Sequence, residues 1–197
     1  MKRILAVMLA LMLLTAGCSV GNDTSAASEE AANPLGDQPL EFYYSSGAGG
    51  WSTQLVLQPD GSFTGHYEDR DLGATGEENP NGTLYYCDFS GSFAAPGEVN
   101  EHQWTMVLEY LQTEQEAGEI RYEDGVACVA TGPVGLEHAG EVWLYLPGTE
   151  TDTLPEEFLA WTTSAFSGEI PDQLPFYGLY SPGDESGFVG YPQQEQG

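Results

Sequence analysis

The sequence contains very few basic residues. It has four Lys and Arg residues against 31 Asp and Glu, which gives a formal net charge of −27 at pH 7. Proteins that bind nucleic acids neutralise phosphates with Lys and Arg side chains, so this composition excludes a nucleic-acid partner. Anionic lipid headgroups would repel the same chain, and electrostatic attraction therefore does not explain a membrane association.

The chain also lacks the motifs of the common catalytic and metal centres. Its three histidines, His66, His102 and His138, are widely spaced, and no H-x-x-x-H, H-E-x-x-H or C-x-x-C sequence occurs. With 31 acidic residues, a suitable pair of carboxylates arises by chance and is weak evidence for a glycosidase. We therefore expect a protein without catalytic activity, metal or cofactor. The alternative is a carboxylate-based hydrolase.

The acidic segment at 68–78 (EDRDLGATGEE) is the one place where a cation site deserves consideration. Its carboxylates offer the oxygen ligands that Ca²⁺ prefers. The segment departs from the EF-hand pattern, because Gly73 stands where a ligand belongs and Ala74 stands where the glycine belongs. We expect a solvated loop. Calcium binding, which would assist a hydrolase, is left open.

Long hydrophobic runs are absent except at the N-terminus. Lys2 and Arg3 precede eleven apolar residues, Ile4 to Leu14. This run is shorter than the about 20 residues that a membrane-spanning helix needs, and it is typical of a signal peptide. The following residues 14–18 (LTAGC) resemble the lipobox of bacterial lipoproteins, although Thr15 stands where Leu is most common.

The lipobox resemblance implies how the protein is processed and where it resides. Residues 1–17 would be removed as a signal peptide, and the thiol of Cys18 would carry lipid, with palmitate among its acyl chains. Two or three acyl chains anchor a protein stably. We therefore expect an extracytoplasmic protein anchored by lipid to a bacterial membrane. The processed chain would keep only Arg70 and Arg121 as basic residues.

Composition divides the remainder of the chain into three parts. Residues 18–39 are small, polar and acidic, and we expect a flexible tether. Residues 40–190 are rich in aromatic and β-branched residues and form the predicted β domain. Residues 191–197 offer little to bury, and we expect a disordered tail.

Within the domain, the hydrophobic pattern has mostly a period of two. Residues 51–57 and 63–68 alternate on either side of Pro59-Asp60-Gly61, which predicts a β-hairpin. A second hairpin is predicted for residues 120–130, because Asp124-Gly125 is a strong hairpin turn. Further strands are expected near 83–89, 104–110, 141–146, 176–180 and 187–191.

One short helix near 154–163 interrupts the strands. Thr153 and Glu156 have the spacing of a capping box, and an apolar stripe follows them. A mostly β domain with one short helix is either a barrel or a sandwich.

The first predicted hairpin carries a resemblance to a known group of folds. It resembles the opening of calycin-type barrels, including lipocalins, in its glycine-tryptophan start, its alternation and its turn: Gly49, Gly50, Trp51, Leu55, Leu57, Asp60, Gly61 and Phe63. The chain as a whole resembles uncharacterised lipocalin-like lipoproteins of anaerobic Gram-positive bacteria. The resemblance implies a single antiparallel calycin-like or lipocalin-like β-barrel that could enclose a small apolar ligand. An immunoglobulin-like β-sandwich is the alternative.

Two cysteines remain after lipidation of Cys18. Cys87 and Cys128 both lie in predicted strands, and exported compartments permit disulfides. We expect a disulfide between them, with two buried free thiols as the alternative.

Aromatic residues are the best candidates for a binding site. Several of them occupy both faces of predicted strands, where one face would be enough for the core: Trp51, Tyr67, Tyr85, Tyr86, Trp104, Trp143 and Tyr145. We expect a non-catalytic binding protein that takes a small apolar ligand or a protein or glycan at the cell surface. A purely structural or inhibitory surface module is a further alternative. The identity of the ligand, the oligomeric state and the membrane leaflet do not follow from the sequence.

Overall fold

The computed structural model describes residues 33–166 and 168–193. The predicted signal peptide, Cys18, most of the predicted tether and the end of the tail lie outside the described residues. Among the described helices, none combines the length and the apolar character needed to cross a membrane.

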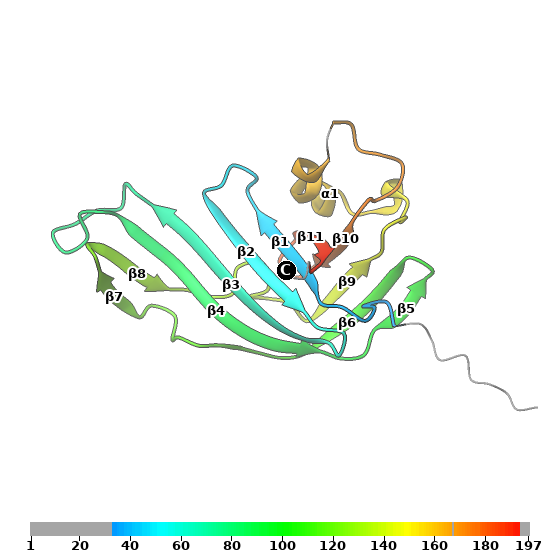
Figure 1. Ribbon diagram of the computed structural model, residues 1–197, viewed down its shortest axis with the longest axis horizontal. Coiled ribbons are helices and arrows are strands. Elements are labelled where there is room, and N and C mark those ends of the chain that lie inside the picture. The colour runs from blue at the N-terminus through cyan, green and yellow to red at the C-terminus, as the bar shows by residue number, and fades with distance from the viewer. Residues whose placement is uncertain (1–32, 167, 194–197) are drawn as a thin grey trace, which may run out of the picture. The chain divides into compact units, whose positions relative to one another are not determined.

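Eight antiparallel strands form a closed barrel in which each strand pairs with the next one along the chain (Figure 1). These strands are β1 (Leu40–Ser45), β2 (Trp51–Leu57), β3 (Ser62–Asp71), β4 (Thr83–Phe93), β6 (Gln103–Thr113), β9 (Glu141–Tyr145), β10 (Tyr177–Ser181) and β11 (Ser186–Pro192). Pairing of β1 with β11 closes the barrel. The predicted lipocalin-like barrel is confirmed, and the immunoglobulin-like alternative is wrong because all eight strands belong to one closed sheet.

Three further strands lie outside this barrel. The strand β5 (Gly97–Asn100) forms a hairpin with β6, and β7 (Ile120–Glu123) forms a hairpin with β8 (Val126–Ala130). The second half of β4 pairs with β6, whereas its first half pairs in parallel with β8. The sheet β3-β4-β8-β7 therefore continues beyond the barrel, at the left of Figure 1. We call residues 67–71, 83–87, β7 and β8 the extension.

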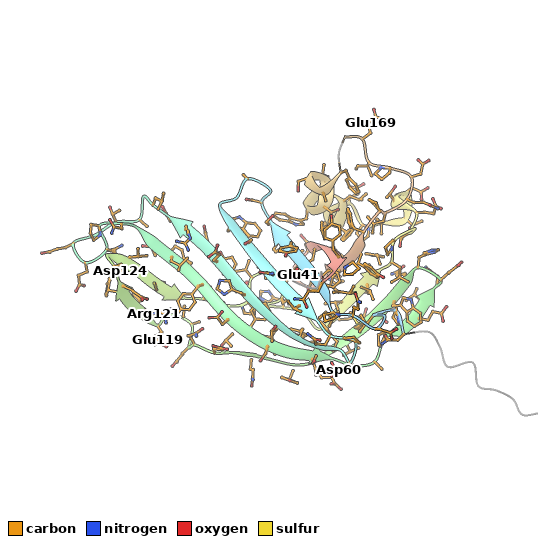
Figure 2. All side chains as sticks on the ribbon, in the orientation of Figure 1. Glu41, Asp60, Glu119, Arg121, Asp124 and Glu169 are labelled. Atoms are coloured by element: carbon orange, nitrogen blue, oxygen red, sulfur yellow. The ribbon has the colours of Figure 1, made fainter. Side chains whose placement is uncertain are left out.

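Both predicted hairpins are present. In the first, Leu57 lies opposite Phe63, and Gly61 adopts the positive φ of 86° that the turn requires. In the second, Asp124 and Gly125 both have positive φ, at 51° and 77°, as expected of a type I′ turn. The two turns lie at opposite ends of the sheet, as the labels of Asp60 and Asp124 show in Figure 2.

The predicted helix is present as α1 (Glu156–Thr162), flanked by 3₁₀ turns at Thr151–Thr153 and Thr163–Ala165. The predicted capping box is wrong. Pro155 precedes the helix without a capping side chain, and the Thr153 hydroxyl instead donates to the carbonyl of Glu150. The helix packs Phe158 onto the outside of the barrel, with its ring 5.2 Å from that of Tyr145.

Side chains fill the barrel interior. Seven inward residues from six strands have no exposed area, namely Phe42, Leu55, Met106, Val142, Leu144, Leu179 and Phe188. A side chain without exposed area borders no void large enough for a water molecule. Leu35 and Leu136, each 2% exposed, close the two ends of the barrel.

The segment 131–140 forms one of these two closures. The Thr53 hydroxyl donates to the carbonyl of Val134 at 2.8 Å, and the Ser186 hydroxyl donates to the carbonyl of Gly135 at 2.7 Å. These bonds tie the segment to β2 and to β11 across the end of the barrel.

Glycines on the strands make room for the large rings inside. A Cβ atom added to Gly65 would lie 2.1 Å from the ring of Phe89, and one added to Gly190 would lie 2.3 Å from the ring of Phe42. The small barrel can therefore hold these phenylalanines only because the neighbouring strand residues lack side chains.

The predicted disulfide is wrong, because Cys87 and Cys128 are free thiols. Cys128 lies opposite Leu84, which is three residues from Cys87. Side chains alternate between the faces of a strand, so an odd separation places the two thiols on opposite faces. Cys87 belongs to the barrel core, whereas Cys128 packs beside Tyr86 on the other face.

We predict that Gly65→Ala destabilises the protein by about 1–3 kcal/mol, because the added methyl group overpacks the ring of Phe89. The midpoint of urea unfolding measures this effect. Gly140→Ala is the matched control, since a Cβ there meets no atom within 4 Å. Equal midpoints for the two variants would contradict the packing described above.

Candidate binding surface

The seven predicted aromatic residues do not form one site. Tyr86, Trp143 and Tyr145 point away from the barrel interior, whereas the other four lie on its inner side. This division follows from strand alternation, which sends Tyr85 and Tyr86 to opposite faces of β4.

The three outward residues serve packing. Trp143 and Tyr145 lie in the cluster under α1, and the indole N–H of Trp143 donates to Glu141 at 2.8 Å. Tyr86 packs with Cys128, and the guanidinium of Arg121 lies 4.8 Å from the centre of its ring.

Two of the four inner residues are also part of the core. Tyr67 and Trp104 are each 8% exposed. The indole N–H of Trp104 has no hydrogen-bond partner among the described residues. Neither ring is accessible to a partner.

The other two inner residues belong to a continuous row across five strands. Trp51 lies opposite Asp69, Asp69 opposite Tyr85, Tyr85 opposite Val129, and Val129 opposite Ile120. Paired residues point to the same face, and neighbouring strands are about 4.8 Å apart, so this inner row spans about 20 Å. It begins at the barrel rim and ends at the edge strand β7.

The inner row is partly open to solvent. Ile120 is 53% exposed, Tyr122 on the same face is 52% exposed, and the other four members of the row are half-buried. The row keeps the apolar character of the barrel interior, but it lies largely in the extension, where the barrel does not enclose it.

A pocket adjoins the rim where the inner row begins. Its volume is about 400 Å³, and Tyr44, Glu137, His138 and Asp184 are among its lining residues. The ring of Tyr44 lies 4.9 Å from Trp51, which connects the pocket to the inner row. Tyr44 also contacts Trp161 of α1, at 4.8 Å.

The sequence carries no signal for this pocket. Its residues come from β1, from the segment 131–140 and from the turn between β10 and β11. No sequence spacing connects these segments, and only the closure of the barrel brings them together.

Asp184 holds the pocket together. Its carboxylate accepts hydrogen bonds from the backbone N–H of His138 at 2.9 Å and from the hydroxyl of Ser181 at 2.8 Å, and Nδ1 of His138 lies 3.0 Å away. Its side chain is 6% exposed, whereas that of His138 is 74% exposed. The interaction fastens the segment 131–140 to the β10–β11 turn.

The same residues are the group most suited to a cation. The ligand atoms of Glu137, His138 and Asp184 lie within 4.8 Å of one another, which suits a divalent metal. Both oxygens of Asp184 already accept hydrogen bonds from the protein, however, and those bonds explain the arrangement without a metal.

The acidic segment 68–78 is organised by its own backbone. Residues 68–71 continue β3, and Oδ1 of Asp71 accepts hydrogen bonds from the N–H groups of Gly73 and Ala74. This arrangement accounts for the loop geometry, and calcium binding stays an untested alternative.

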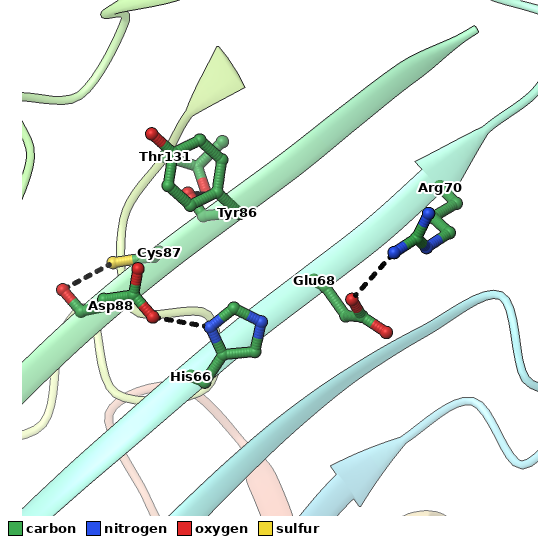
Figure 3. A network of polar contacts seen from close by, with 7 residues as sticks. All are labelled: His66, Glu68, Arg70, Tyr86, Cys87, Asp88 and Thr131. Atoms are coloured by element: carbon green, nitrogen blue, oxygen red, sulfur yellow. Dashed lines mark hydrogen bonds and ion pairs between the residues drawn. The ribbon is translucent and has the colours of Figure 1, made fainter. Parts of the chain in front are cut away.

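The outer face of the extension carries a small buried cluster of Tyr86, Cys128 and Ala130, with polar pairs beside it (Figure 3). Glu68 and Arg70 lie 3.6 Å apart in the extension, and His66 and Asp88, which follow on the same face just outside it, lie 2.6 Å apart. Both pairs are exposed and contribute little to stability.

Cys87 is not an activated nucleophile. Burial, with smaller effects of Asp88 and Glu137, raises the pKa of its thiol to about 11. The thiol therefore stays protonated near neutral pH, where only the thiolate would react.

Comparison with known proteins found no matching family model, no matching curated protein and no matching solved structure. The only support for the candidate binding surface is therefore the arrangement and exposure of its own residues.

We predict that alkaline pH weakens the fold partly through Tyr44. Burial, with the nearby charge of Asp184, raises the pKa of Tyr44 from 10.0 to about 12. The unfolded chain loses this proton at lower pH than the folded chain, so the stabilisation is complete below pH 10 and falls as the pH rises toward 12.

Urea unfolding of the wild type and of Tyr44→Phe, followed across this pH range, measures the effect. The variant should lose less stability than the wild type between pH 10 and pH 12, since it has no phenol to ionise. If the stability of the wild type and of the variant changed with pH in parallel, Tyr44 would have the same pKa in the folded and unfolded chains, which would contradict the prediction.

Proposed function

We propose that this chain is a lipid-anchored, exported protein that binds a partner on the open inner face of its extension and performs no catalysis. The lipobox at residues 14–18 supports the anchor. The inner row supports the binding surface.

The observation that carries this proposal is the contrast between the filled barrel and the open row. A ligand pocket needs about 300–1,000 Å³, whereas the fully buried interior residues border no void of water size. A small apolar ligand inside the barrel is therefore disfavoured. The inner row instead presents aromatic and apolar side chains over about 20 Å, which suits a polypeptide partner.

The rim pocket does not favour the hydrolase alternative. Glu137 and Asp184 are the carboxylates that approach each other there. A catalytic pair needs one carboxylate that can exchange a proton with a substrate. The side chain of Asp184 is almost completely buried, and both of its oxygens accept protein hydrogen bonds.

The anchor is tested by Cys18→Ser in the full chain. We expect the variant to stay unprocessed and to incorporate no radiolabelled palmitate, because no thiol is available at the lipobox. Gel mobility and palmitate labelling in a bacterial host measure both effects. A Cys18→Ser variant that still incorporates palmitate would place the lipid at another residue and contradict the proposed anchor.

The binding surface is tested with a displayed library of random twelve-residue peptides. The full chain in a nonionic detergent is the target. Peptides that it enriches should bind Ile120→Ser about ten-fold more weakly, because central apolar contacts dominate interface energies. Fluorescence anisotropy of labelled peptides measures the affinities.

Val107→Ser is the matched control. Val107 is 52% exposed and Ile120 is 53% exposed, and both lie on strands. Val107 belongs to β6 of the barrel, however, and not to the extension. Equal losses in the two variants, or a library without enriched peptides, would contradict a binding surface at the inner row.

A further inference from the structure

We infer that the partner of the inner row is an extended polypeptide segment that carries lysine or arginine. This inference rests on the proposed binding function and gives the partner its chemistry. It follows from how the sheet distributes charge between the two faces of the extension.

Both arginines of the described residues lie on the outer face. Arg70 pairs with Glu68 there, and Arg121 lies over the ring of Tyr86. The register confirms this placement, because Arg70 lies opposite Leu84 and Arg121 lies opposite Cys128. Lysine does not occur among the described residues.

The inner face carries carboxylates instead. Asp69 is itself a member of the inner row, and Asp71 lies two residues further along the same face of β3. Glu137 approaches from the segment 131–140. Its charge and that of Asp69 both act on Tyr67, whose pKa they raise in addition to the larger effect of burial. The inner face therefore carries negative charge in and beside the row, and neither described arginine lies on it.

The order of side chains in the row forms a site that suits a lysine or arginine side chain. Asp69 lies between Trp51 and Tyr85, so a carboxylate is flanked by two aromatic rings. The alkyl stem of lysine or arginine packs on such rings, while its charged group interacts with the ring face and with the carboxylate. Val129 and Ile120 continue the row with apolar side chains.

This order also sets a spacing in the partner. Asp69 and Ile120 are three strands apart, which is about 14 Å at 4.8 Å per strand. An extended chain advances about 3.3 Å per residue, so a basic residue and an apolar residue about four positions apart fit both ends.

The overall charge favours the same partner. A net charge of −27 attracts basic polypeptides over long distances and speeds their association. The same charge repels a second copy of the chain and an anionic lipid surface. A basic polypeptide is therefore the occupant whose charge complements the surface.

Three labelled ten-residue peptides test this inference. Each has leucine and a variable residue four positions apart on a threonine background, and the variable residue is lysine, glutamine or glutamate. Fluorescence anisotropy with the full chain in nonionic detergent measures binding, with empty micelles as the blank. The lysine peptide should bind at least ten-fold more tightly than the glutamine peptide, and its affinity should fall as NaCl increases.

A matched pair of variants separates the inner face from general attraction to an acidic protein. Asp69→Asn removes one charge from the inner row, and Glu123→Gln removes one charge from the outer face of β7, where Glu123 lies opposite Val126. Asp69→Asn should weaken binding of the lysine peptide about three-fold, as expected for an ion pair that solvent still reaches, and Glu123→Gln should leave the affinity unchanged. Equal effects of the two substitutions would overturn the inference.

The outcomes also distinguish this inference from the proposed function. If the glutamine or glutamate peptide binds as tightly as the lysine peptide and Ile120→Ser weakens it, the binding surface stands and the basic partner is overturned. If no peptide responds to Ile120→Ser, both are overturned. Self-association that Ile120→Ser abolishes, measured by sedimentation, would assign the row to a second copy and overturn the basic partner.

Discussion

The narrow interior of an eight-stranded barrel is the constraint on which the rest of this structure depends. A barrel of this size has room for side chains and little else when its inward residues are large. Here phenylalanine rings fill the interior, and Gly65 and Gly190 leave them the space they occupy. The segment 131–140 and Leu35 then close the ends. The partner that we propose would therefore bind outside the barrel.

The open inner face of the extension exists because β4 pairs with different strands along its two halves. Its second half pairs with β6 and completes the barrel, whereas its first half pairs with β8 and leaves it. The same face of β4 thus lines a sealed core at Phe89 and an open surface at Tyr85. An apolar face that would be buried in a simple barrel becomes accessible. Side-chain alternation along β3 and β7 places Arg70 and Arg121 on the opposite face.

The sequence predicted the features that local chemistry determines. Asp60-Gly61 and Asp124-Gly125 specify their turns, so both hairpins could be placed, and the calycin resemblance led to the barrel. Pairings between distant segments left no such signal. The parallel contact of β4 with β8 was not foreseen, and it determines which face Cys128 occupies and therefore why the disulfide is wrong. Of the inner row, the sequence predicted only Trp51 and Tyr85. Ile120 joins the row through the parallel pairing of β4 with β8, which the sequence did not reveal.

The two ends of the barrel differ in what lies beside them, and this difference determines where a tether would join the domain. The described chain begins at Asn33, whose side chain donates to the carbonyl of Pro59 at the β2–β3 turn. The extension lies at the other end of β3, which at ten residues and about 3.3 Å per residue is about 33 Å long. A tether that leads to a lipid at Cys18, as we propose, would enter the domain at Asn33, at the end remote from the inner row. Tension on that tether would act first on Asn33 and the β2–β3 turn, and not directly on the part of β3 that carries the row.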